Sequence, residues 1–87
     1  DDLLNAAYGA LRADLAAFDA EYGGAAPSQA DALRDMQRAW IAFRDARCAY
    51  EASLWGGGTG GGPAATACLM AETAQQALYL EEQLGEE

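Results

Sequence analysis

The segment MQRAWIAFRDARCAYEASLWGGGTGGGP, residues 36–63, combines a helical pattern with an abrupt break. Its large side chains recur every three or four residues, at Met36, Trp40, Phe43, Tyr50 and Leu54, with Arg47 filling the one gap. That spacing places them on one face of a helix, and Trp40 and Phe43 are predicted core residues. Because the glycine-rich run disfavours a helix, the segment predicts a long helix that ends near Trp55.

The same periodicity extends on both sides of this segment. Large apolar side chains recur every three or four positions from Leu4 to Tyr22 and stop at Gly23-Gly24. Ser28 is suited to an N-cap, and Pro63 to the first turn of a third helix. We therefore expect an all-α fold, a small up-down-up three-helix bundle that forms a single domain over residues 1–87. The expected helices lie at about 2–22, 28–55 and 64–84, with a Gly-rich loop at 56–62.

The composition excludes several classes of protein. Of the 87 residues 52 % are apolar, but 22 of these are Ala, Val is absent and Ile occurs once, which argues against a sheet and for a thin core. The net charge of −9 comes from 14 Asp and Glu against 5 Arg, without Lys or His. Nucleic acid is therefore an unsuitable partner. Without His the chain lacks the usual zinc ligand and the base of a catalytic triad, so we expect no metal, no cofactor and no enzymatic activity.

The negative charge is concentrated in the two outer helices. Residues 1–22 sum to −4, residues 28–55 balance four acidic residues with four Arg, and residues 64–87 carry five Glu and no base. Such a distribution attracts basic proteins. The pairs Glu81-Glu82 and Glu86-Glu87 are consistent with a solvated tail, and alternatively with a weak calcium site.

The two cysteines lie on either side of the Gly-rich run. Cys48 precedes it by about seven residues and Cys68 follows Pro63 by five, so an antiparallel hairpin brings them to similar heights. This predicts a disulfide, whose closed loop contributes about 3 kcal/mol in the chain-entropy model. The alternative is a pair of buried free thiols.

The same register predicts two further contacts between the central and third helices. One turn beyond the cysteines, Arg44 faces Glu72, and Gln37 faces Tyr79 two turns further on. We therefore predict an Arg44–Glu72 ion pair, shielded by the disulfide and by Trp40. Arg44 is alternatively a partner-binding residue.

The Gly-rich run resembles a phosphate-binding loop in composition alone. It lacks the preceding strand, the Lys and the following Ser or Thr at fixed spacing. It is either a plain connector or an exposed loop that inserts into a partner's cleft, and Asp45 is either a solvated surface group or a cap for this loop. The candidate partner-binding residues are Trp55, Gly57, Gly58, Thr59 and Gly60.

Three stretches of the chain resemble one known family. These are QRAWIAFRDARC at residues 37–48, Cys68-Leu69 with Thr73 five residues after the cysteine, and Leu4-Asn5 with Tyr8 and Leu11 upstream. The sequence resembles the LprI-type lysozyme inhibitor family, although Gln76 stands where that family often has Arg. The resemblance marks Trp40, Arg44, Asp45, Glu72 and Thr73 as signature or structural residues.

The resemblance also implies a location and a function. Members of the family are secreted, periplasmic or lipid-anchored bacterial proteins, which implies a removed signal peptide and an oxidised Cys48–Cys68 pair. We expect a binding protein whose acidic helices attract a basic lysozyme and whose loop blocks the enzyme's cleft. The alternative is a structural or interaction module of the cell envelope without an enzyme target. No membrane span is expected in this chain, and a lipid anchor on a longer precursor stays open.

Overall fold

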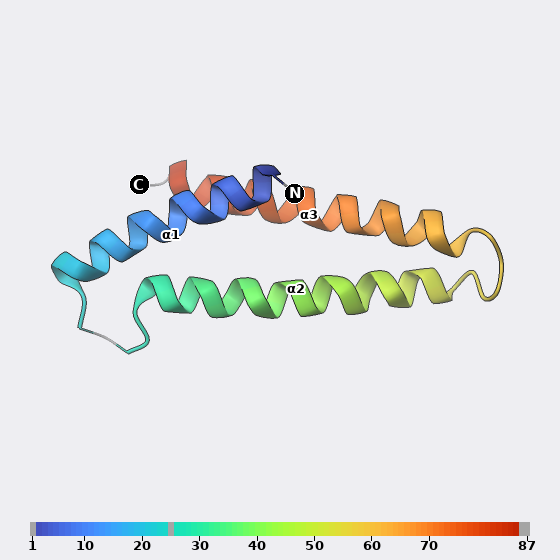
Figure 1. Ribbon diagram of the computed structural model, residues 1–87, viewed down its shortest axis with the longest axis horizontal. Coiled ribbons are helices and arrows are strands. Elements are labelled where there is room, and N and C mark those ends of the chain that lie inside the picture. The colour runs from blue at the N-terminus through green and yellow to red at the C-terminus, as the bar shows by residue number, and fades with distance from the viewer. Residues whose placement is uncertain (1, 25, 86–87) are drawn as a thin grey trace.

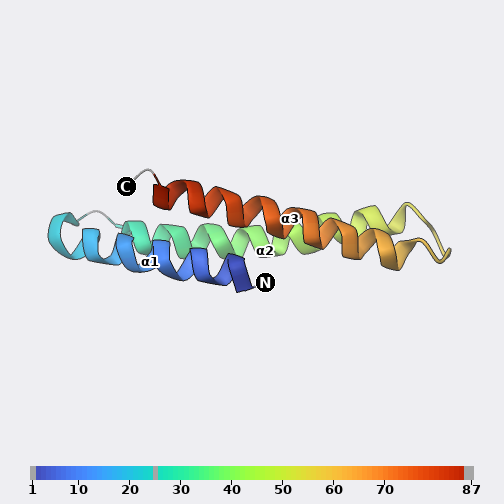
Figure 2. The ribbon, with the colours of Figure 1, turned by 90° about the horizontal axis from the view of Figure 1, so that it is seen from above.

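The computed structural model describes residues 2–24 and 26–85, which form three α-helices that run up, down and up (Figure 1). They are α1 (Asp2–Tyr22), α2 (Gln29–Ser53) and α3 (Gly61–Gly85). Seen from above, α1 and α3 lie side by side along α2 (Figure 2). The all-α fold class predicted from the sequence is confirmed.

The molecule is elongated, because α1 accompanies only part of the hairpin that α2 and α3 form. Its principal extents are 54 × 23 × 16 Å, and its radius of gyration is 16.1 Å, against about 12 Å for a compact chain of this length. Figure 1 shows α1 starting near the middle of the long axis. We call residues 2–40 and 76–85 the three-helix end, and residues 41–75, where α2 and α3 are paired without α1, the hairpin end.

The apolar core lies in the three-helix end. Its buried members come from all three helices: Leu4, Ala7, Leu11, Leu33, Ala77 and Leu80. Leu80 has no exposed surface, and Trp40 is half-buried against this cluster. The small Ala side chains let the helices approach closely, so this thin core is packed with few large residues.

The prediction that Phe43 belongs to the core is wrong. Phe43 is 57 % exposed, and Tyr50 and Leu54, further along the same seam, are exposed as well. Two paired helices bury only the sides that face each other. Since α1 does not reach this part of α2, the large side chains of the seam beyond Trp40 remain in contact with solvent.

The connection from α1 to α2 is held by one side chain of α1. The carboxylate of Asp19 accepts hydrogen bonds from the backbone amides of Gln29, at 3.1 Å, and Ala30, at 2.9 Å. The Oγ of Ser28 accepts a third bond, from the Asp31 amide at 3.2 Å, which confirms Ser28 as the N-cap. Three of the four amides that a helix start leaves unpaired are therefore satisfied, and a negative charge sits at the positive end of the helix dipole.

The loop between α2 and α3 lies two residues earlier than predicted, at 54–60 instead of 56–62. The helix α3 begins at Gly61, before the predicted start at Ala64, so Gly61 and Gly62 are helical. The first amides of a helix have no intrahelical partner, which allows Pro63 in the first turn. The carbonyl of Gly60 accepts from the Ala64 amide at 3.0 Å and thereby closes that turn. Gly56, at φ 58°, has the left-handed conformation that glycine adopts without strain.

Candidate functional site

The disulfide joins the two helices of the hairpin end. Cys48 on α2 and Cys68 on α3 are bonded, with their Cα atoms 5.4 Å apart and both side chains buried. This confirms the pairing predicted from the sequence. The cross-link holds together an end of the molecule that has no third helix and no cluster of buried large side chains.

An ion-pair network surrounds the disulfide, and its arginine is Arg47. The Nη1 of Arg47 donates to Oε1 of the buried Glu72, and its Nε lies 3.5 Å from Oε2 of Glu51. The same Glu51 oxygen lies 2.8 Å from Sγ of Cys68. Arg47 thus balances two carboxylates that the hairpin brings against the disulfide.

The predicted Arg44–Glu72 ion pair is therefore wrong. The guanidinium of Arg44 lies over the Trp40 ring, 5.0 Å from its centroid, and donates to Oδ1 of Asp45 at 2.9 and 3.0 Å. Stacking on an aromatic ring and pairing with a neighbouring carboxylate hold the charge of Arg44 at its own helix. Asp45 is accordingly the partner of Arg44 at an exposed position, and within the described residues its side chain forms no hydrogen bond or ion pair with the loop, which does not support the alternative that it caps the loop.

A neutral pair of amides takes the place of the predicted Gln37–Tyr79 contact. Nε2 of Gln76 donates to Oε1 of the buried Gln37 at 2.9 Å, whereas Tyr79 is exposed. Gln76 is the position at which the resembling family often has Arg. A neutral amide suits a buried amide partner without the desolvation that a charged group would require.

The loop forms an exposed tip, which we define as residues 55–60. Trp55 is 58 % exposed, and the tip residues Gly57, Gly58 and Thr59 are exposed as well. A Cβ added to Gly60 would lie 2.1 Å from Cε3 of Trp55, so the indole ring lies directly against the glycine backbone. Gly60 therefore allows the Trp55 ring to pack against its backbone. A Cβ on Gly58 would lie 3.1 Å from the Trp55 carbonyl oxygen, whereas one on Gly57 would meet nothing within 4 Å.

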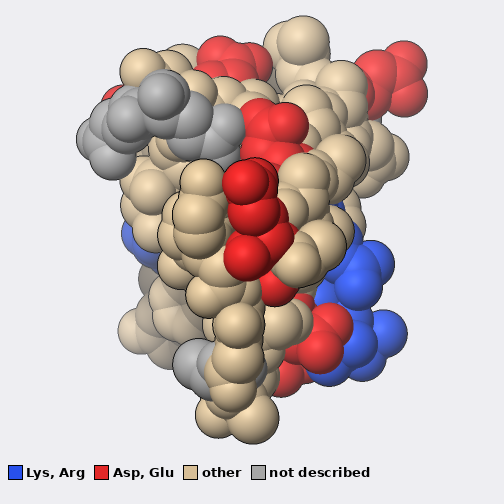
Figure 3. All heavy atoms as spheres, turned by 90° about the vertical axis from the view of Figure 1, so that its left-hand side faces the viewer, with Lys and Arg blue, Asp and Glu red and all other residues tan. Residues whose placement is uncertain are grey.

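The opposite end of the molecule is acidic. Figure 3 looks onto this end and shows carboxylates over its centre and top, with Arg side chains toward both edges, most of them at the lower right. Arg34 pairs with Asp31 at 3.3 Å and with Asp35 at 3.1 Å. Four exposed carboxylates of this end form no ion pair within residues 2–24 and 26–85: Asp14, Glu21, Glu81 and Glu82. We call these four the acidic end.

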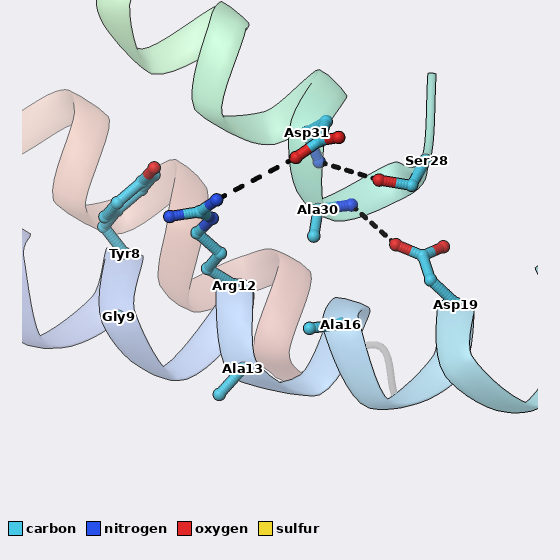
Figure 4. A pocket seen from close by; sticks show the side chains of 9 residues that line it. All are labelled: Tyr8, Gly9, Arg12, Ala13, Ala16, Asp19, Ser28, Ala30 and Asp31. Atoms are coloured by element: carbon cyan, nitrogen blue, oxygen red, sulfur yellow. Dashed lines mark hydrogen bonds and ion pairs between the residues drawn. The ribbon is translucent and has the colours of Figure 1, made fainter. Parts of the chain in front are cut away.

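A shallow groove lies between α1 and the start of α2 (Figure 4). It measures about 660 Å³ and has a floor of small residues. Arg12 reaches across it to within 3.9 Å of Asp31, and Asp19 is engaged in capping α2. The lining residues are Tyr8, Gly9, Arg12, Ala13, Ala16, Asp19, Ser28, Ala30 and Asp31. The charged groups of this groove, Arg12, Asp19 and Asp31, thus already have partners within the chain.

One group of potential metal ligands occurs within the described part of the chain: Cys48, Glu51 and Cys68. Metals bind cysteine as a thiolate. Both sulfur atoms are consumed by the disulfide, so in the oxidised protein this group offers one carboxylate. The arrangement serves the fold of the hairpin end.

Sequence reasoning placed the signature residues correctly on their helices but missed several partners. The structure brings Trp40, Arg44 and Asp45 together on α2, whereas Glu72 and the buried Thr73 lie on α3, where Glu72 pairs with Arg47. Arg47 and Glu51 are four residues apart, the spacing of a helical ion pair, and that signal could have revealed them. Nothing in the local sequence indicates that Asp19 reaches α2.

The described residues thus form an elongated helical protein with a disulfide and an ion-pair network at one end, an exposed tip beyond them and an acidic end opposite. The family described as lysozyme inhibitor LprI matches residues 1–80, and the chain belongs to this family. Neither a curated protein nor a solved structure was found to match it. No helix within the described residues is long and apolar enough to cross a bilayer.

Proposed function

We propose that this protein binds and inhibits a lysozyme outside the cytoplasm, in the periplasm or after secretion. The observation that carries the proposal is its membership of the LprI lysozyme inhibitor family over residues 1–80. The net charge of −9 suits a basic enzyme, because opposite net charges raise the rate of encounter.

Two surfaces are suited to the enzyme, and they lie at opposite ends of the molecule. The acidic end offers four unpaired carboxylates, and the tip offers Trp55 with Thr59 on a narrow projection. We propose that the acidic end attracts the lysozyme and that the tip blocks its cleft. The molecule is 54 Å long and the Debye length is about 8 Å at physiological salt. The acidic end therefore attracts an enzyme that binds at the tip only at low salt, where the Debye length is about 30 Å at 0.01 M, and each surface has its own test.

The test is a titration of hen lysozyme with the oxidised protein, using a soluble neutral chito-oligosaccharide as substrate. Inhibition that is strong at low salt and about tenfold weaker at about 0.3 M salt is expected from charge attraction. Full enzyme activity in excess protein at low salt would contradict the proposal.

Variants at the two ends assign the contributions. Trp55→Ala is expected to weaken inhibition at least tenfold, as for an aromatic anchor residue, with Tyr22→Ala, an exposed aromatic residue at the other end, as its control. The double variant Glu81→Gln/Glu82→Gln is expected to slow association and to reduce the salt dependence. Inhibition unchanged in Trp55→Ala would remove the tip from the contact.

A second function is favoured by the contacts of the signature residues. Arg44 pairs with Asp45, Glu72 pairs with Arg47, and Thr73 is buried, so each of them serves the fold of the chain itself. In an interaction module of the cell envelope, these residues would only have to stabilise the fold. Absence of lysozyme binding, together with one envelope protein crosslinked specifically to the chain in living cells, would establish this alternative.

A further inference from the structure

A stripe of large side chains on α2 is uncovered at the hairpin end. Phe43, Tyr50 and Leu54 are 57 %, 63 % and 67 % exposed, and Arg47 completes a series with steps of four, three and four residues. These steps keep the side chains on one face of the helix. Single exposed apolar residues are ordinary on a protein surface, but a continuous stripe marks an interaction surface.

Small residues of α3 lie beside this stripe. A groove of about 440 Å³ runs between the two helices. It is lined by Arg47, Glu51, Leu54 and Trp55 of α2 and by Ala64, Ala67, Cys68, Ala71, Glu72 and Gln75 of α3, so the alanines lie beside the Arg47 ion pairs. The three alanines follow each other at steps of three and four residues, so they form a shallow row on one face of α3. We call the groove and the stripe together the open face: Phe43, Arg47, Tyr50, Leu54, Trp55, Ala64, Ala67 and Ala71.

We propose that the open face is the interface of a homodimer with two-fold symmetry. A two-fold axis brings the same surface of both chains together in opposite directions. The large residues of α2 in each chain then lie over the row of alanines on α3 of the other chain. Large side chains that pack against small ones let helices interdigitate, and two hairpins joined in this way form a four-helix bundle.

The distribution of charge favours a dimer formed through the hairpin end of each chain. The hairpin end has three carboxylates and two Arg, and Arg47 on the open face is already balanced by Glu51 and Glu72. A dimer through this face keeps the two acidic ends far apart. A dimer through the three-helix end would bring at least eight unpaired carboxylates together, four from each chain, at a cost in Coulomb energy.

The exposed area is also sufficient. With about 200 Å² for a fully exposed large side chain, the exposed fractions of Phe43, Tyr50, Leu54 and Trp55 correspond to about 500 Å² per chain. A two-fold dimer would bury about 1,000 Å² from these residues, the size at which specific interfaces begin. Trp55 belongs to both the open face and the tip, so the dimer covers it and competes with the proposed insertion of Trp55 into a lysozyme cleft. The loop residues beyond Trp55 lie outside the groove.

Sedimentation equilibrium of the oxidised protein over a range of concentrations tests the dimer. We expect the mass to rise from 9.1 kDa to twice that value, and the association to persist at about 0.5 M salt, because its contacts are apolar. Tyr50→Glu and Ala67→Arg, both at exposed positions, are expected to raise the dissociation constant at least tenfold. Tyr22→Glu, an equally exposed tyrosine on α1, is the matched control and should leave the dissociation constant unchanged.

Two outcomes would overturn the proposal. One is a monomer at every concentration up to about 1 mM, and the other is a dimer that Tyr50→Glu leaves intact. Circular dichroism shows whether each variant is folded. If Ala67→Arg does not fold, Tyr50→Glu alone tests the dimer interface. The measurement contains no lysozyme, so its failure would leave the proposed inhibition untouched.

Discussion

At the scale of single residues, the partner of a long side chain depends on what else lies within its reach. Arg44 and Arg47 are three residues apart on α2, and both can extend toward the same turn of α3. Arg44 is held by the Trp40 ring and Asp45, so Arg47 pairs with Glu72. The carboxylate of the Arg47–Glu72 pair is nearly buried, whereas that of the Arg44–Asp45 pair is exposed, so removing the two carboxylates should affect stability differently.

Glu72→Gln is expected to lower the free energy of unfolding by about 1 kcal/mol, because it leaves Arg47 without its buried partner. Solvent screens part of this charge interaction, since the Arg47 side chain is half exposed. Urea unfolding monitored by circular dichroism measures the difference. Asp45→Asn, in the exposed pair with Arg44, is the control and should change stability by less than about 0.5 kcal/mol. Equal effects of the two variants would contradict the assignment.

Leu80→Ala and Leu78→Ala compare the same substitution on two faces of α3. Leu80 has no exposed surface and its truncation should cost about 2–5 kcal/mol. Leu78 is 59 % exposed, and its truncation should cost less than about 0.5 kcal/mol. Thermal unfolding of both variants measures the contrast. A small effect at Leu80 would mean that the core lies elsewhere.

At the scale of helices, the joint between α1 and α2 depends on a cap supplied from outside α2. Asp19 accepts hydrogen bonds from the amides of Gln29 and Ala30. Gly23 follows the last residue of α1, and its amide donates to the carbonyl of Asp19. A Cβ on Gly23 would lie 2.2 Å from the carbonyl oxygen of Asp19, so another residue at this position would displace the backbone. The order of this joint therefore depends on both residues.

Asp19→Ala should destabilise the protein by about 1 kcal/mol, the usual effect of losing a helix cap. Hydrogen exchange should increase most at the amides of Gln29 and Ala30, which lose their acceptor, whereas the Asp31 amide keeps Ser28 Oγ. Asp14→Ala removes an equal charge from an exposed position on the same helix and is the control. Unchanged exchange at the start of α2 would show that Ser28 suffices as the cap.

At the scale of the whole molecule, the two ends are stabilised by different means. The three-helix end is held by its apolar cluster, whereas the hairpin end is held by the disulfide and the Arg47 network. The same division separates the charges, with the acidic end at one extreme and the tip at the other. Stability and function are therefore expected to respond separately to changes at each end.

The double variant Cys48→Ala/Cys68→Ala is expected to lose about 3 kcal/mol of stability, the entropic contribution of the closed loop. Native-state hydrogen exchange should rise first at the hairpin end, in residues 44–53 and 61–72, while amides around Leu80 remain protected. Exchange that rises equally along all three helices would contradict the separation into two ends.

The local pattern of the sequence was sufficient for the helices and for the disulfide. Apolar spacing, the cap at Ser28 and the glycine runs identified all three helices to within three residues of their observed ends. The heights of Cys48 and Cys68 in a hairpin predicted their bond. These features depend on neighbours in the chain, because helix geometry repeats every 3.6 residues and caps act within one turn.

Only the tertiary structure decided which large side chains are buried and which charges pair. The spacing of apolar residues shows which face of α2 is apolar. It does not show that α1 does not extend along the hairpin end, where Phe43 and Tyr50 are exposed. A register fixed by the disulfide places Glu72 near one turn of α2, but an arginine side chain is longer than the 5.4 Å pitch of that turn. The choice of Arg47, and the open face beside it, follows from how much of each helix its neighbours cover.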